Sequence, residues 1–471
     1  MRRLLSLGGL VLLAACTVGP DYQPPVVDSI PDEFRYAPAA TASVVAEVRD
    51  RWWSIFDDAL LDSILLEVRS ANRELQAAVA RLDATRAAIG LARADGLPAV
   101  SLEPSVIRQS LSENAQTFGG SGDDNLDAFA PDLDFTTYAL PVQASWEIDV
   151  VGRVRRSVEA AVADVEAAEA DVADLLLLLE ADAAELYFSI RAFDLEIELL
   201  EATAEARKEG LELVETRFEL GVVDELDVAQ ARTQLATAEA AALGVRRQRI
   251  AAETALAALA GKTATRFVVA PLPLEGEPPS VPAGLPSELL RARPDVRSAE
   301  RSIASANARV GIAEAAFYPS VTLVGSGGFS ALDESRWIES DSVFWSIGPQ
   351  VYLPIFQGGR LDADLEAAQA RYEASLLDYQ AVVLRSFAEV ENRLAASELI
   401  EAQLLVQGEA VNAADRALEL ANIKYRGGIS DYLTVLDSER TKLDVERQQA
   451  QLRGQAYINT VRLVRALGGR W

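Results

Sequence analysis

The chain of 471 residues contains no histidine and only one cysteine, Cys16. These scarcities exclude Ser-His-Asp and Cys-His catalytic arrangements and the usual zinc sites built from histidine and cysteine. Carboxylates alone could still support an enzyme, but no pair of them stands apart from the general acidic background. We therefore predict no catalytic residue, no metal site and no enzymatic activity.

Basic residues are also few, because 44 Lys and Arg stand against 72 Asp and Glu, a net charge of -28. This balance argues against nucleic acid as a partner, since phosphates require a basic face. Solvated helix faces account for most acidic runs, and a lumen that admits cations is a second interpretation.

The N-terminus has the pattern of a secretory signal peptide over residues 1–15. Two arginines precede the apolar run 4–13, which is too short to cross a bilayer as a helix. The sequence LAAC that ends at Cys16 resembles a bacterial lipobox, in which cleavage leaves an acylated cysteine. An ordinary signal peptide with a chance cysteine is the alternative. We predict a lipid on Cys16, no other cofactor, and an acylated strap over residues 16–57.

The chain contains an internal duplication. Residues 80–102 align without a gap on residues 301–323, QASWEIDVVGR from Gln143 aligns on QVYLPIFQGGR from Gln350, and RFELGVVDELDV from Arg217 aligns on KYRGGISDYLTV from Lys424. The first half has an insertion that includes the surface loop GGSGDDNLDAFAPDLD. We predict repeats over residues 58–262 and 285–471, joined by a proline-rich linker at 263–284.

Each repeat predicts a helix, two strands, a very long helix, a tight turn and another helix. The long helices are expected over residues 153–219 and 360–425, and the first would be on the order of 100 Å long. Apolar residues spaced by three and four predict a coiled-coil seam with a left-handed supercoil. The seam residues are Val158, Val162, Val165, Val172, Leu176, Leu179, Ala183, Leu186, Ile190, Phe193, Ile197, Leu200, Leu211, Val214 and Phe218.

The strands alternate apolar and polar residues, as transmembrane β-strands do, although a half-buried sheet in a soluble domain has the same period. Four such strands cannot close a barrel alone, and an open sheet edge is not viable in lipid. If the strands span a membrane, several chains must therefore pool them. The apolar series are Tyr138, Leu140, Val142, Ala144, Trp146 and Ile148, then Val343, Trp345, Ile347, Val351, Leu353 and Ile355, with weaker versions at Val100, Leu102, Val106, Val321 and Leu323.

Five segments along the chain resemble outer-membrane efflux proteins of the TolC/OprM/NodT type, most closely the lipoprotein branch. They are CTVGPDYQPP from Cys16, WWSIFDDALLDSIL from Trp52, WEIDVVGR from Trp146, ARPDVRSAE from Ala292 and LPIFQGGR from Leu353. The resemblance implies a mainly α, α+β membrane fold, with a long coiled-coil helical barrel and four transmembrane strands per protomer. Three protomers would share a twelve-stranded β-barrel in the outer membrane, anchored by lipid, with the helical tunnel in the periplasm.

The same resemblance implies a passive channel-tunnel of a tripartite efflux system that exports small molecules such as drugs. Its partners would be two further copies, a periplasmic adaptor protein and an inner-membrane pump of the resistance-nodulation-division class. A protein-secretion duct, and a coiled-coil spacer without a pore, are the rival interpretations, and the alternating strands argue against the spacer. The run GSGG at residues 325–328 is not a phosphate loop, because no Lys-Ser/Thr follows.

Glycines mark the predicted turns between the long helices and their successors, with N-caps near Asp224 and at Ser430-Asp431. The resemblance implies that these tips face the adaptor; they comprise Gly221, Val222, Val223, Gly427, Gly428 and Ile429. Leu433 and Asp437 match the family's constriction and lie four apart on one helix face. A merely solvated Asp437 is the alternative. Thr434 and Ser430 depart from the second aspartate and the latch arginine of some relatives.

Overall fold

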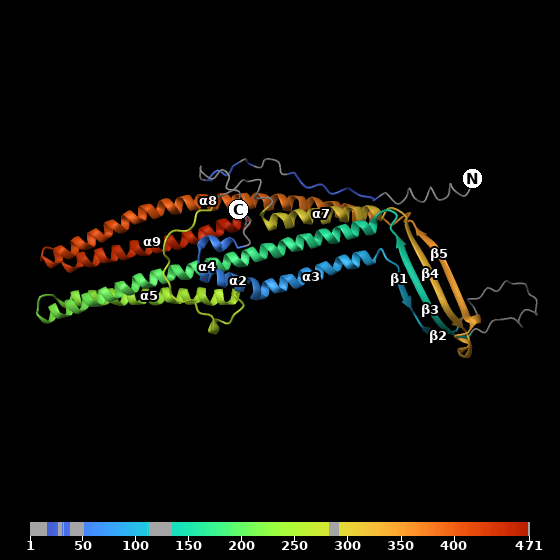
Figure 1. Ribbon diagram of the computed structural model, residues 1–471, viewed down its shortest axis with the longest axis horizontal. Helices are drawn as coiled ribbons and strands as arrows, with labels where there is room; N and C mark the ends of the chain where they lie inside the picture. Colours follow the sequence, from blue (N-terminus) through green and yellow to red (C-terminus); the bar gives the residue numbers. More distant parts are fainter. Residues whose placement is uncertain are drawn as a thin grey trace, which may run out of the picture. The chain divides into compact units, whose positions relative to one another are not determined.

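The computed structural model describes residues 17–26, 31, 33–37, 51–110, 112, 134–281 and 292–469. Cys16, the predicted signal peptide and most of the predicted insertion loop lie outside these residues. The chain divides into two compact units. The sheet unit comprises Met1–Pro24, Ala84–Glu166 and Arg301–Leu376, and the helical unit comprises Pro25–Asp83, Ala167–Glu300 and Leu377–Trp471. Figure 1 labels their elements.

The sheet unit contains one antiparallel sheet with the order β1-β3-β4-β5, in which β2 also pairs with β3. Two helices of equal length precede its strands in the two repeats: α3 (Arg73–Ala94) and α7 (Pro294–Ala315). The strands are β1 (Ala99–Leu102), β2 (Ser105–Ser110), β3 (Asp134–Ile148), β4 (Ser320–Ala331) and β5 (Val343–Tyr352).

Strands β1 and β2 lie end to end beside β3 and are interrupted at Pro104, so together they occupy one strand position of the sheet, here called a lane. Leu102 pairs with Val142 and Ser105 pairs with Ala139, so the register continues unchanged across the gap. Proline has no N–H to donate to the ladder, which is why the lane breaks there. The sheet therefore has four lanes, and the prediction of four strands is confirmed.

The long helices form two hairpins, and both long helices begin in the sheet unit and continue into the helical unit. Helix α4 (Arg153–Glu219) and α8 (Arg360–Arg426) have 67 residues each, and α5 (Glu225–Leu259) and α9 (Tyr432–Ala466) have 35 each. The predicted bounds of both long helices are confirmed to within one residue. Within the described residues, the remaining helical elements are α2 (Ala59–Ala71) and the short 3-10 turns Trp52–Phe56, Ala264–Arg266, Glu334–Arg336 and Ser340–Ser342.

The main hydrophobic core lies where the middle of α4 meets α2, the end of α5 and the end of α9. Trp53, Tyr187, Leu256 and Val461 are each almost completely buried there. Most of the predicted α4 seam is buried or half-buried within the chain, whereas Phe218 near the tip is 44% exposed. Between Leu177 and Leu200, α4 is buried beyond its seam as well, because other helices cover its remaining faces there.

Candidate functional site

The register of the sheet separates its side chains into an apolar and a polar face. Residues directly opposite each other on neighbouring strands share a face. Val142, for example, lies between Leu102 and Gly327, and Gly327 lies opposite Trp345. The apolar residues of one face are Val100, Leu102, Val106, Tyr138, Leu140, Val142, Ala144, Trp146, Ile148, Val321, Leu323, Phe329, Val343, Trp345, Ile347 and Val351. Where β2 ends and β3 begins, this face becomes polar, with Arg108, Ser110, Asp134 and Thr136.

The other face is mostly polar, with Ser101, Thr137, Gln143, Ser145, Glu147, Thr322, Ser326, Ser346 and Gln350. The predicted alternation is therefore confirmed and extends across all four lanes. One part of it is wrong: Leu353 and Ile355 follow the end of β5 at Tyr352. Pro354 stands between them, and a proline ends a strand because it cannot donate to the ladder.

The described part of this chain leaves the apolar face and both sheet edges uncovered. Trp345 is 77% exposed and Ile347 is 68% exposed. The outer lanes, β1 with β2 on one side and β5 on the other, each have one neighbouring strand. An exposed apolar surface that extends across several strands marks a contact with lipid or with protein. The unpaired sheet edges require partner strands from outside the described part of this chain.

The two hairpin tips have the same backbone geometry. Gly221 and Gly428 have left-handed φ angles of 70° and 71°. The N–H of the following residue donates back to the last helical turn, Val222 to the Arg217 carbonyl and Ile429 to that of Lys424, both at 2.9 Å. This is the Schellman arrangement that glycine permits. The predicted stops at Gly221 and Gly428 are confirmed.

The helices after the tips begin at aspartate caps, as predicted. Asp224 accepts a hydrogen bond from the N–H of Asp227, and Asp431 accepts one from the N–H of Thr434. Asp431 also accepts a bond from the Thr434 hydroxyl at 2.8 Å. The threonine at the position where some relatives have an aspartate therefore belongs to the cap.

The predicted tip and gate residues are exposed in the single chain, except Val223, which is half-buried. Ile429 is 79% exposed, Val222 68% and Leu433 49%. The Asp437 carboxylate accepts a hydrogen bond from Arg440 at 2.8 Å, an exposed pair on one helix that contributes little stability. The pairing of Arg440 with Asp437 was not predicted, although a spacing of three residues on a helix indicates such a pair. A role for Leu433 and Asp437 in a constriction stays a prediction.

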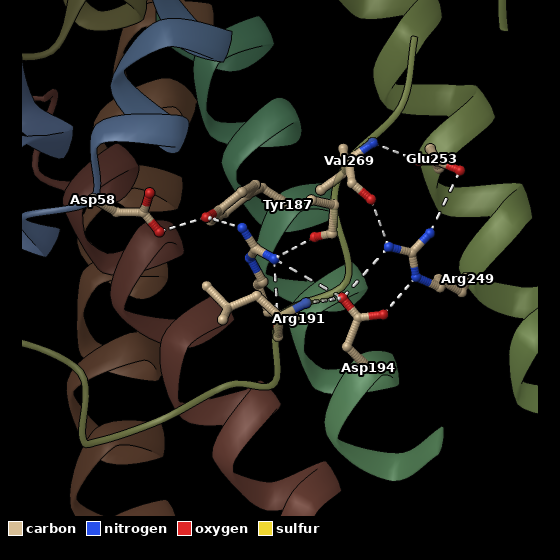
Figure 2. Close-up of polar contacts among 9 residues, drawn as sticks. Asp58, Tyr187, Arg191, Asp194, Arg249, Glu253 and Val269 are labelled. Carbon is tan, nitrogen blue, oxygen red and sulfur yellow. Dashed lines mark hydrogen bonds and ion pairs between the residues drawn. The ribbon is translucent and has the colours of Figure 1, made fainter. Parts of the chain in front are cut away.

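A buried polar cluster in the helical unit was not predicted (Figure 2). Arg191 and Asp194 of α4 and Arg249 and Glu253 of α5 hold the extended segment 267–274. Arg191 donates to the Ala270 carbonyl at 2.9 Å, and Arg249 donates to the Val269 carbonyl at 2.8 Å. Asp194 and Glu253 accept from the N–H groups of Leu272 and Val269 at 3.1 and 2.6 Å.

Charges inside this cluster are compensated by partners, as buried charges must be. Burial, together with the Asp58 carboxylate, raises the pKa of the Tyr187 hydroxyl. Burial alone would lower the pKa of Arg249, but the hydrogen bonds and charges of Asp194 and Glu253 together outweigh burial and raise that pKa. Residues 269–272 of the predicted linker 263–284 are thus bound by these side chains. In the sequence, the charged residues Arg191 and Asp194 within the apolar run of α4 were the one indication of a buried polar cluster.

The described ranges hold no group of three or more His, Cys, Asp and Glu that could bind a metal ion. In the same ranges, no helix combines the length and apolarity needed to cross a membrane. The sheet unit has a cavity of about 230 Å³ where strands meet helices, lined among others by Glu147, Arg153, Tyr318 and Tyr352. Arg153 and Glu147 form a two-point ion pair at 2.9 and 2.8 Å, so this cavity presents no unpaired charge from either.

Comparisons with known proteins agree with this architecture. The outer membrane efflux protein family matches residues 64–262 and 285–469. The chain is 33% identical over 477 residues to the probable efflux pump outer membrane protein TtgC of Pseudomonas putida, covering 100% of this chain and 96% of that protein. It is 31% identical to the pyoverdine export outer membrane protein OpmQ of Pseudomonas aeruginosa, covering 100% and 97%.

The solved structure of the outer-membrane channel OprN is similar throughout. It superposes with a TM-score of 0.87 at 32% identity, covering 96% of this chain and 99% of that one. Both repeats, the alternating sheet and the paired long hairpins lie within the region of similarity. This chain therefore belongs to the outer membrane efflux protein family and has the fold of its outer-membrane channel-tunnels.

Proposed function

We propose that three copies of this chain form a passive outer-membrane duct that exports small molecules for a tripartite efflux system and catalyses no reaction. The observation that carries the proposal is the unfinished sheet. Its four lanes present a continuous apolar face to lipid, yet closed membrane barrels need about eight strands or more. Further copies of the chain would supply the missing strands at both edges.

The long helices support the same assembly. Leu384 and Leu405 of α8 are 70% and 72% exposed, and Leu243 and Ile250 of α5 are 62% and 60% exposed. Apolar stripes of this kind on coiled-coil helices call for partner helices. Neighbouring protomers would cover them and complete the wall of a tunnel in the periplasm.

The tips are the proposed docking surface for a periplasmic adaptor, which would connect the duct to a resistance-nodulation-division pump. Val222 and Ile429 are apolar and exposed on turns of matching geometry. Leu433 and Asp437 would form two rings near the axis of the trimer, where three carboxylates would attract cations. The pump would select the exported compound. The relative OpmQ is named for pyoverdine export, which is one example of the small-molecule cargo that we propose.

Cys16 is the proposed attachment point of a lipid. This lipid is the one non-protein group that we assign to the chain. Acyl chains would anchor the N-terminus in the outer membrane through buried methylenes. Replacement of Cys16 by serine should abolish incorporation of labelled palmitate. Persistent label in Cys16→Ser would contradict the assignment.

Single-channel recording in planar bilayers tests the duct. The purified oligomer should conduct, and Asp437→Ala should weaken cation selectivity or raise conductance, whereas Asp378→Ala on α8 should change neither as strongly. A folded oligomer that never conducts would favour the coiled-coil spacer instead. Export of a folded protein substrate, with no effect of deletion on drug tolerance, would favour a secretion duct.

A further inference from the structure

The N-terminal segment of residues 17–22 is bound to the sheet unit along its backbone. The N–H of Val18 donates to the carbonyl of Val151 at 3.0 Å. Thr17 lies against Gly152, where an added Cβ would come within 2.7 Å of the threonine methyl group. Val151 and Gly152 connect the end of β3 to the start of α4. The segment therefore begins at a junction between strand and helix.

Arg156, in the first turn of α4, holds this segment. Its side chain is 4% exposed, and its Nε donates to the Val18 carbonyl at 3.1 Å. Its Nη2 donates to the Gly19 carbonyl at 3.0 Å and to the Asp21 carboxylate at 3.1 Å. Its Nη1 pairs with Glu159 at 2.8 Å. One buried guanidinium thus binds two consecutive backbone carbonyls and a side chain of the same segment.

Helix α7 completes the binding groove. The buried amide of Asn307 donates to the Pro20 carbonyl at 2.8 Å, so three successive carbonyls are bound by side chains. Gly19 has a φ angle of 94°, and a Cβ there would lie 2.4 Å from the Gly311 Cα. A Cβ on Gly311 would in turn lie 3.0 Å from the Arg156 Nε. Backbone and guanidinium fit here only because both positions lack a side chain.

With the proposed cleavage before Cys16, residues 17–22 would be among the first residues of the mature chain. Terminal residues fray unless specific contacts tie them down, and a buried arginine requires several partners to offset its lost hydration. Here the arginine's partners are mainly the segment itself. The segment starts one residue after Cys16, and one residue spans at most about 3.6 Å. Thr17, the residue that follows Cys16 in the sequence, is held beside Gly152, close to the end of β3, where the apolar face of the sheet ends at Ile148.

We propose that Arg156 is a positioning residue that fixes the lipid anchor to the strand–helix junction. The inference rests on the proposed acylation of Cys16. With the segment bound, acyl chains enter the membrane beside the apolar face of the sheet, and anchor and sheet insert as one body. Without the contacts of Arg156, the same lipid is connected to the sheet only through the unbound residues 17–26. It then no longer directs the sheet into the membrane.

The test combines Arg156→Ala with Cys16→Ser in the full-length protein, and uses Arg155→Ala as the matched control. Arg155 lies next to Arg156 on α4 but is 45% exposed and pairs with Asp149 instead. Two quantities are measured: hydrogen exchange of the Val18 amide, and the rate at which newly made chains become membrane-inserted oligomers. Labelled palmitate is read on the same samples, and circular dichroism confirms that each variant is folded.

In the acylated protein, Arg156→Ala should speed exchange of the Val18 amide by roughly tenfold or more and slow insertion, while Arg155→Ala changes neither. In the Cys16→Ser background, Arg156→Ala should not slow insertion further, because there is no anchor to position. Asn307→Ala, which removes one hydrogen bond, should show the same pattern more weakly and covers the case in which Arg156→Ala fails to fold.

Equal slowing by Arg156→Ala in both backgrounds would show that the arginine only stabilises the junction, and would overturn the inference while leaving acylation intact. Unchanged Val18 exchange would overturn it by showing that Arg156 does not hold the segment. Wild-type protein without palmitate label would overturn the acylation proposal and the anchor role together. The three failures have different signatures.

Discussion

The two hairpins of the helical unit have matching local structure and different surroundings. In each, a helix of 67 residues ends at a left-handed glycine and a helix of 35 residues starts at an aspartate cap. In the first hairpin the long helix α4 contributes more residues to the core than α5 does. In the second hairpin the short helix α9 contributes more than the long helix α8, which exposes a row of leucines.

Helices α4 and α9 form an inner pair, joined by polar contacts and close packing. Arg447 of α9 binds the buried Glu196 of α4 at 2.6 Å, and Arg462 binds Glu185 at 2.8 Å. Gly454 lies so near Ala192 that an added Cβ would come within 2.7 Å of the alanine Cβ. A duplicated sequence thus reproduces helix lengths and turns, while the tertiary packing decides which helix of each hairpin is inside.

The largest effect should come from breaking an ion pair of the inner helices. Glu196→Ala leaves Arg447 without its buried partner and should cost about 3 kcal/mol of unfolding free energy. Glu201→Ala removes the exposed pair between α4 and Arg246 of α5 and should cost about 0.5 kcal/mol or less. Denaturant unfolding of the detergent-solubilised protein measures both. Equal costs would contradict the distinction between inner and outer helices.

Two glycine-to-alanine changes should have opposite signs. Gly454→Ala inserts a methyl group between α9 and α4 and should destabilise by about 1–3 kcal/mol through overpacking. Gly244→Ala on α5 meets nothing within 4 Å and should stabilise by about 0.5–1 kcal/mol because alanine favours the helix. Thermal unfolding midpoints provide the comparison. A stabilising Gly454→Ala would mean that α4 and α9 are not in close contact.

The two N-caps should respond alike, which tests the similarity of the tips. Asp224→Ala and Asp431→Ala each remove a carboxylate that accepts a backbone N–H, and each should cost about 1 kcal/mol. Hydrogen exchange in the first turns of α5 and α9 locates the effect. If only one substitution loosened its helix, the two tips would differ in more than sequence.

The smallest expected effect is a pH dependence near the second tip. Burial raises the pKa of Glu439 above its ordinary 4.5, although Arg207 lowers it. The folded state therefore binds this proton more tightly, so the stability it contributes is complete below pH 4.5 and is lost as pH rises through the raised pKa. Burial raises the pKa of Tyr432 to about 12, which keeps this neighbour neutral throughout.

Glu439→Gln should remove that loss, so the variant should gain thermal stability over wild type as pH increases from 4.5 toward neutrality. Glu409→Gln, on the exposed side of α8, is the control. The measurement is the unfolding midpoint of all three proteins across this range. A constant difference between Glu439→Gln and wild type at every pH would refute the assignment.

Sequence pattern predicted the parts of this protein that depend on neighbours along the chain. Repeated spacing set the long helices, Gly221 and Gly428 set their ends, and Asp224 and Asp431 set the next starts, because caps and turns are short-range hydrogen bonds. Alternation over residues 138–148 likewise predicted the two faces of the strand. The gate residues and the lipid site were carried over by resemblance, and they stay predictions.

Contacts between distant residues were decided only by the tertiary structure. Arg156 and Arg155 are adjacent in sequence, yet one is buried under residues 17–22 and the other is exposed. In the sequence, Arg191 and Asp194 only interrupt an apolar run. In the structure, their side chains form hydrogen bonds with the segment 267–274. By itself the sequence determined which helices and strands form. The tertiary structure decided which charges are buried and which of two similar helices lies inside. Both depend on contacts with residues distant in the sequence, which a local sequence pattern does not predict.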